Sequence, residues 1–271
     1  MNIYKKQIAL AIFILFTYIS ARAQMADVII LNTDTMRIFT DPLESMSIKN
    51  NNALFYFDKD TCASKKCVKG YVGEWLLDED KLYLKNIFNC CYEKDSVPAD
   101  MKKKFGKKYK KDRVFADWYT GKILAYKGKV LFKDEEPSES VYEKEIQFKI
   151  EKGEVKGTKK FDNSKTKIST YYTNQSSLTD FLESNINWKK IPKLKDKILF
   201  VDINFSVDSL GKISKANFTK KEFDQLYYDE AIRVIKKIPN WNVLYFHGVF
   251  KPKAYVETIE FSEEIRKKYV K

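Results

Sequence analysis

Few side chains in this sequence suit catalysis or metal binding. His247 is the only histidine among the 271 residues, so a Ser-His-Asp triad or a histidine-based metal site lacks its parts. The sequence holds no glycine-rich phosphate loop and neither a GxSxG nor an HExxH motif. We therefore expect no catalytic residue, no metal and no cofactor, and we interpret His247 as a surface or turn residue beside Gly248.

Two carboxylates next to tryptophans are the exception. Glu74 precedes Trp75, and Asp117 precedes Trp118, each in a stretch with the composition of a strand. Paired acids near an aromatic platform suit glycoside hydrolysis or sugar binding. Adjacent strand residues point to opposite faces, so an acid beside a core tryptophan usually faces water. Sugar binding or glycoside chemistry is kept as the alternative function.

Four cysteines could hold zinc as thiolates or pair as two disulfides. They are Cys62, Cys67, Cys90 and Cys91. Disulfides are the usual state in an exported protein, and the N-terminus indicates export. A bond between the neighbours 90 and 91 would strain the peptide that joins them. We therefore expect both bridges to tie the 62–67 segment to the 90–91 segment.

The register of a predicted hairpin narrows the pairing. GYVGEWLL and KLYLKNIF are interpreted as strands joined by the turn DED. If Leu77 lies opposite Lys81, the residue numbers of cross-strand partners sum to 158, and Cys67 faces Cys91 within disulfide reach. A bulge at a glycine of the first strand would bring Cys90 opposite instead. Cys62 would then pair with the cysteine that remains.

The first residues have the pattern of a secretory signal peptide. Two lysines precede the apolar run 8–19, and the small-x-small sequence ARA stands before Gln24. This pattern predicts a signal peptide over residues 1–23, cleaved between Ala23 and Gln24. A helix over residues 8–19 would span about 18 Å, short of the roughly 30 Å hydrocarbon core of a membrane. We expect a periplasmic or secreted mature chain without a transmembrane segment.

The excess of positive charge, formally +13, is concentrated in one run. KKKFGKKYKKDR has eight basic residues and one acid. Its lysines are Lys102, Lys103, Lys104, Lys107, Lys108, Lys110 and Lys111. Such a run can bind polyanions, although a solvated surface loop is the simpler interpretation. Export argues against nucleic acid as the partner.

Residues 24–161 have the texture of short strands. Stretches rich in Val, Ile, Tyr, Phe and Trp alternate with Asn, Asp, Gly and Lys clusters. They predict an antiparallel β-rich domain, folded as a sandwich or a barrel. The polar residues 162–177 are predicted to form a linker or an exposed arm, and residues 262–271 a basic tail.

Residues 178–261 predict a small α+β unit. SLTDFLESNI can begin a helix capped by Ser177 or Thr179. In ILFVDINFSVD apolar side chains alternate strictly, which indicates a half-buried strand. A turn at Gly211 leads into a second strand, ISKANF.

A helix and a third strand complete this unit. In YYDEAIRVIKKIPNW the apolar residues recur at helical spacing, and Pro239 closes the helix. Its start is open, because Thr219 with Glu222 could cap a longer helix. KAYVETIEF, residues 253–261, is the last strand. The order is strand, strand, helix, strand, with the helix covering one face of the sheet.

These segments together resemble the C-terminal domain of the TonB family. The similarity covers roughly residues 178–261 and rests on LTDFLESNINW, VDINFSVDSLGKIS, YDEAIRVIKKIPNW and HGVFKPKAYVETIEF. It implies a three-stranded sheet covered by a helix, a non-catalytic role and a place in the Gram-negative periplasm. It also implies recognition of a partner that adds an extended peptide to the sheet edge. By this resemblance the binding edge is formed by Tyr255, Val256, Glu257, Thr258 and Ile259.

The departures from the family favour an adaptor over an energy transducer. The membrane anchor and long proline-rich segment of energy-transducing members have no counterpart in this sequence, and Asn242 stands where the family has proline after the tryptophan. We therefore expect an exported, non-catalytic binding protein of the cell envelope. Its partner would be an envelope protein or peptide, an outer-membrane receptor among the candidates.

Overall fold

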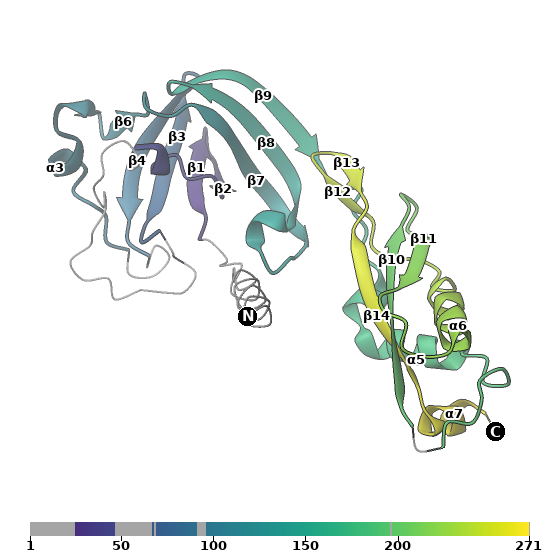
Figure 1. The fold of residues 1–271 in the computed structure, drawn as a ribbon. Coiled ribbons are helices and arrows are strands. Elements are labelled where there is room, and N and C mark those ends of the chain that lie inside the picture. The colour runs from purple at the N-terminus through teal and green to yellow at the C-terminus, as the bar shows by residue number, and fades with distance from the viewer. Residues whose placement is uncertain (1–24, 47–66, 68, 91–95, 196, 271) are drawn as a thin grey trace, which may run out of the picture. The chain divides into compact units, whose positions relative to one another are not determined.

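A computed structural model describes residues 25–46, 67, 69–90, 96–195 and 197–270 (Figure 1). The predicted signal peptide with its cleavage site, Cys62 and Cys91 lie outside the described residues. The described chain is a mixed α+β protein, mostly strands with few helices, which confirms the predicted class. None of its described helices is long and apolar enough to cross a membrane.

The chain divides into two compact units. The front unit comprises the described residues up to Lys127 together with Asp134–Ser140 and Ile146–Lys159. The C-terminal unit comprises Gly128–Lys133, Val141–Glu145 and the chain from Lys160 onward.

Nine strands form the larger sheet, which curves strongly in Figure 1. They are β1 (Asp27–Leu31), β2 (Asp34–Ile38), β3 (Val72–Asp78), β4 (Lys81–Phe88), β5 (Tyr109–Lys110), β6 (Arg113–Phe115), β7 (Gly121–Phe132), β8 (Val141–Glu151) and β9 (Glu154–Asp162). The pairing order is β3-β1-β2-β7-β8-β9-β4-β6-β5, and β3 also pairs with β4. Seven strands therefore form a closed circuit of pairings. Two short helical turns, η1 (Gly106–Lys108) and η2 (Pro137–Glu139), and the helix α3 (Met101–Phe105) interrupt the strands.

One pairing departs from the predicted antiparallel arrangement. β1 lies parallel to β3, with Ile29 opposite Trp75. The reason is the long connection between β2 and β3, which lets β3 run in the same direction as β1. The expectation of a purely antiparallel domain was therefore wrong at this pair. Side chains from both strands enter the core of the unit, where Ile29 and Trp75 are fully buried.

The predicted register of the β3–β4 hairpin was wrong. Asp78, not Leu77, lies opposite Lys81, because the turn has two residues, Glu79 and Asp80, both with positive φ. Two positive-φ residues are the mark of a type I′ hairpin turn. A further register shift falls between Glu74 and Trp75. The residue numbers of cross-strand partners therefore do not add up to the same value along the whole hairpin.

The disulfide nevertheless joins the two predicted segments. Cys67 is bonded to Cys90, with their Cα atoms 5.9 Å apart. This confirms that a bridge joins the two predicted segments. The partner of Cys67 is Cys90, which was the alternative, and not Cys91. Cys67 precedes β3 and begins a turn in which the Gly70 amide donates to the Cys67 carbonyl over 3.1 Å. From this turn the side chain of Cys67 reaches Cys90.

The C-terminal unit is built on a three-stranded sheet with the order β11-β10-β14 (Figure 1). Its elements are α4 (Thr170–Thr173), α5 (Gln175–Asn185), β10 (Leu199–Val207), β11 (Ile213–Phe218), α6 (Gln225–Ile235), β12 (Leu244–Phe246), β13 (Val249–Lys251), β14 (Ala254–Phe261) and α7 (Glu263–Tyr269). β12 and β13 form a separate hairpin. Val201, Ile203 and Phe205 are buried on the inner face of β10, as the alternation predicted.

The helix boundaries differ from the predicted ones. The side chain of Asn174, not Ser177 or Thr179, caps α5 by accepting from the Ser177 amide over 3.0 Å. α6 begins after Asp224, which excludes the longer helix capped by Thr219. It ends at Ile235, since turns replace helical geometry before Pro239.

The segments predicted as linker and tail carry ordered structure. Residues 162–177 contain α4 and the buried polar residues Asn163 and Ser169. The Ser169 amide donates to the Asn242 side chain over 2.8 Å. In the tail, α7 buries Ile265, and Arg266 donates to three backbone carbonyls of residues 188–192. Both segments are therefore part of the C-terminal unit.

Candidate functional site

β14 is an edge strand of the C-terminal sheet. It pairs with β10 along its whole length, in one unbroken register from Leu199 opposite Phe261 to Ser206 opposite Ala254. No strand of the described chain pairs with its other side. All five residues predicted to bind a partner, 255–259, lie in this strand. Its outer side is therefore the side on which an extended segment could add to the sheet.

The inner face of the sheet is closed by helices and aromatic rings. α6 packs on β10 and β11, and α5 contacts β14 (Figure 1). Tyr255 is buried in a ring cluster in which Trp241 and Phe205 lie 5.6 and 5.7 Å from it between centroids. Burial raises the pKa of Tyr255 to about 12. Tyr255 and Ile259 thus anchor β14 to the core and hold the edge strand in position.

The opposite face of the sheet is open within this unit. Phe200 on β10 is 56% exposed and Val256 on β14 is 54% exposed. Between them the Thr258 hydroxyl donates to the Asp202 carboxylate over 2.7 Å. On this face Val256 is the exposed apolar side chain of the edge strand, next to where the side chains of an added strand would lie.

Glu257 is the half-buried acid of this edge. Its side chain lies on the inner face, between Tyr255 and Ile259 in the alternation of β14. Burial raises the pKa of the Glu257 carboxyl, and a hydrogen bond with the Gln175 side chain at the start of α5 partly counteracts the shift. Among the described residues, its partner is thus a neutral amide and not a cation.

The basic run lies in α3, η1, β5 and the turn that follows β5 at Lys111, and all seven predicted lysines are exposed. Asp100 caps α3 by accepting from the Lys103 amide over 2.9 Å. Lys108 forms an exposed ion pair with Asp117 at 3.4 Å, which contributes little stability. The run is thus an ordered segment that presents its charge to solvent.

The structure does not assemble the acids of the sugar alternative into one site. Glu74 accepts from the Asn86 side chain over 3.0 Å, whereas Asp117 is exposed beside Lys108. Trp75 is fully buried, and its indole donates to Asp27 over 3.0 Å. Trp118, beside Asp117, is partly buried, donates through its indole to the Pro42 carbonyl over 3.0 Å, and stacks on Phe105.

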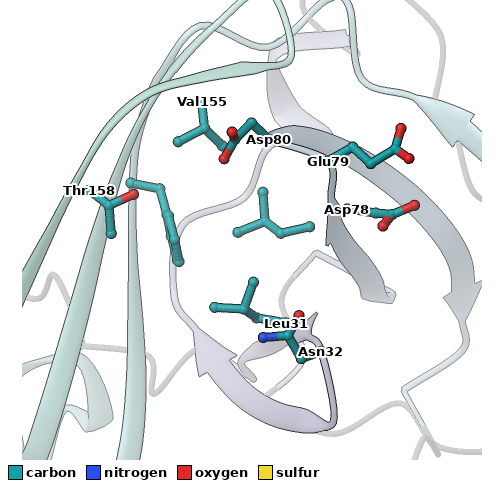
Figure 2. Close-up of a pocket in the computed structure, with 9 residues that line it drawn as sticks. Leu31, Asn32, Asp78, Glu79, Asp80, Val155 and Thr158 are labelled. Atoms are coloured by element: carbon teal, nitrogen blue, oxygen red, sulfur yellow. The ribbon is translucent and has the colours of Figure 1, made fainter.

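A cavity of about 340 Å³ opens elsewhere in the front unit (Figure 2). Leu31, Leu77, Phe148 and Val155 supply its apolar lining. Asp78 at the end of β3 and the turn acids Glu79 and Asp80 border it, but Figure 2 shows the side chains of Asp78 and Glu79 directed away from its middle. Asp78 is already paired with Arg113 over 2.6 Å. Neither Glu74 nor Asp117 borders this cavity.

Sequence reasoning missed a buried ion pair in the front unit. The fully buried Asp27 pairs with Lys69 and accepts from the Gly73 amide over 2.8 Å and from the Trp75 indole. Burial raises the pKa of Asp27, and the charge of Lys69 counteracts the shift. The signal in the sequence was an acid two residues before the inward-facing Ile29 of the same strand.

A second buried acid lies beside the only histidine. His247 is in the turn between β12 and β13, with φ of 51°, and its Nε2 is 3.5 Å from the buried carboxylate of Glu145. Asn163 donates to the same carboxylate over 2.9 Å. Burial raises the pKa of Glu145, and His247 counteracts it. The turn position of the histidine agrees with the sequence prediction.

Comparisons of the chain with family models, with curated proteins and with solved structures find no match. The resemblance to the TonB C-terminal domain rests on the sequence segments quoted above. Within the described chain, the β14 edge is the best-defined candidate site.

Proposed function

We propose that this chain is an exported, non-catalytic binding protein that recognises an extended segment of a partner by pairing it with β14. The partner is an envelope protein or peptide, and the C-terminal unit is the recognition module. The resemblance to the TonB C-terminal domain supports the same mode and the same strand. Main-chain hydrogen bonds supply the affinity of such pairing, and side-chain contacts on alternate positions supply its specificity.

The contrast between the two edges of the sheet carries the proposal. Natural sheets protect their edges with lysines, bulges and short strands. β11 shows such features, because it contains Lys215 and has a register shift where Val207 pairs with Ile213. β14 has no lysine and no register shift along its eight residues. β14 therefore lacks two of the protections that β11 carries, although the charged residue Glu257 points to its inner face, and this difference between the two edges favours a use of β14 in binding.

The test is a selection of peptide ligands followed by backbone substitution. Randomised nine-residue peptides displayed on phage are selected against residues 24–271, and the affinity of individual peptides is measured by fluorescence anisotropy. In an antiparallel edge strand, adjacent residues direct their amides alternately to the neighbouring strand and to the free side. Of Val256→Pro and Glu257→Pro, one therefore removes a free-side amide and leaves the β10 ladder intact.

The variant that stays folded is expected to lose peptide binding at least tenfold. Val256→Ile is the matched control, because it changes the side chain but keeps both the amide and an apolar surface, and it is expected to bind within about threefold. Hydrogen exchange gives a second reading, since free-side amides of β14 should become protected when peptide binds. Unchanged affinity in a folded proline variant, together with unchanged exchange in β14, would contradict the proposal.

A further inference from the structure

Glu257 occupies an unusual position for a carboxylate, and this position bears on which partners the edge accepts. It is half-buried on the inner face of an edge strand, between the anchored residues Tyr255 and Ile259. Its hydrogen-bond partner is the side chain of Gln175, a neutral amide, and no cation contributes to its environment among the described residues. A partly desolvated carboxylate without a cation is incompletely compensated.

An added strand would bring a new side chain next to this carboxylate. Directly opposite residues of paired strands have Cβ atoms about 4.5–5.5 Å apart and point to the same face. The residue opposite Glu257 would thus share the inner face with Gln175, at the border of α5. Its neighbours on the added strand would point to the other face, beside the exposed side chain of Val256.

We propose that Glu257 is a specificity-determining residue of the β14 edge, selecting segments with a lysine or arginine opposite it and apolar residues on both sides of that base. This inference rests on the proposed function and names the chemistry of the partner segment. A lysine or arginine reaches the carboxylate with its cationic end and donates a charge-assisted hydrogen bond. The flanking apolar residue that lies opposite Val256 covers its exposed side chain on the open face.

The alternation of the partner follows from the pleat of β14. Position p is basic and lies on the inner face, and positions p−1 and p+1 are apolar and lie on the open face. Thr258 and Asp202 lie in the middle of that face and are hydrogen-bonded to each other. They are therefore not expected to select a charged residue in the partner. An acid at position p would face Glu257 directly, and like charges opposite each other disfavour pairing.

The first experiment compares selections from the same phage library against the wild-type chain and against Glu257→Gln. Wild-type binders should be enriched in Lys or Arg at one position flanked by Val, Ile, Leu or Phe. The enrichment of the base should disappear with Glu257→Gln, while the apolar flanks remain. Glu264→Gln, an exposed acid of α7, is the matched control and should select the same peptides as the wild type.

The second experiment is a double-mutant cycle on one selected peptide. Replacing its base with glutamine should weaken binding to the wild type about tenfold, which corresponds to about 1.4 kcal/mol. The same replacement should change binding to Glu257→Gln less than twofold, because the two changes remove one interaction. Thermal denaturation of each variant confirms that folding is unchanged.

The outcomes separate this inference from the proposed function. Two outcomes would overturn the role of Glu257 but leave edge pairing intact. In the first, the selected peptides depend on the β14 backbone but have no basic position. In the second, replacing the base weakens binding to the wild type and to Glu257→Gln equally. A selection without any peptide that depends on β14 would overturn both. The role of Glu257 is established if the preference for a base disappears in Glu257→Gln and is kept in Glu264→Gln.

Discussion

Removing the carboxylate of Asp27 tests whether the buried ion pair holds the front unit together. In Asp27→Ala the Gly73 amide and the Trp75 indole lose their acceptor. Each buried donor left without a partner costs about 1–3 kcal/mol. Lys69 keeps a carboxylate of Asp41 at 3.9 Å, but breaking a buried ion pair still costs about 3–5 kcal/mol.

These terms overlap, because they describe the same desolvated groups, so we expect a loss of about 4–6 kcal/mol in the free energy of unfolding. A loss of this size is a large part of the roughly 5–15 kcal/mol that stabilises a typical protein. Asp27→Asn keeps the shape and one acceptor, and should cost about half as much. Asp34→Ala is the matched control, since its ion pair with Lys127 is about half exposed and should be worth less than about 1 kcal/mol.

Urea unfolding of residues 24–271 gives the measurement. Tryptophan fluorescence follows both units, through Trp75 and Trp118 in the front unit and through Trp188 and Trp241 in the C-terminal unit, and circular dichroism follows the whole chain. Because the chain has two units, their transitions are fitted separately and not as one two-state process. A loss below about 1 kcal/mol, or a loss equal to that of Asp34→Ala, would refute the idea that this ion pair anchors the front unit.

Three further predictions test the surface, the sulfur pairing and the C-terminal turn. Changing lysines 102–104 to glutamate should abolish weak retention on heparin, and raising salt to 1 M should do the same, because the Debye length falls from about 10 Å to about 3 Å; retention that ignores both changes contradicts it. Tryptic digestion without reduction should release CVK bonded through Cys67 to the peptide of Cys90, and finding both thiols free in exported protein would refute the pairing. Gly211→Ala should destabilise the chain by more than about 1 kcal/mol, because φ is 85° and its Cβ would lie 2.9 Å from the Trp241 carbonyl oxygen. Gly157→Ala, with open space around it, is the control for chemical denaturation, and equal effects would count against the turn argument.

The spacing of apolar residues predicted a helix or strand well where one face of that element packs on the core of its own unit. The alternation over residues 199–207 identified β10, and the apolar stripe ending before Pro239 identified α6. Boundaries were less predictable, since several side chains can cap the same helix. Asn174 precedes Ser177 and takes the capping role at α5. The sequence offers both side chains, and only the backbone geometry selects between them.

The hairpin register could not be derived from composition because its turn uses uncommon residues. Type I′ turns are usually marked by Asn-Gly or Asp-Gly, but here Glu79 and Asp80 adopt the positive φ values. The shift beside Trp75 adds a second change of register. Cys67 lies beyond the end of this ladder, so its bond with Cys90 depends on the turn before β3 and not on cross-strand counting.

The buried charges were hidden for a different reason. Asp27 and Gly73 are 46 positions apart, and the contact between them exists only once β1 and β3 lie side by side. No window of sequence contains both residues. The same holds for Glu145 and His247, which come from β8 and from a hairpin turn. Long-range pairing therefore decides which charged residues are buried, and local patterning does not.

Long-range pairing also decides which strand is an edge, and this determines where binding can occur. β10 and β14 alternate in the same way, yet β10 is flanked on both sides and β14 on one. In the large sheet the pairing of β3 with β4 closes a circuit of seven strands and removes those edges, whereas the three-stranded sheet has too few strands to close. It must leave two edges. One carries a lysine and a register shift, and the other, β14, carries neither but has a partly desolvated acid, Glu257. β14 thus lacks the lysine and the register shift of β11, and this difference between the two edges supports a binding role for β14.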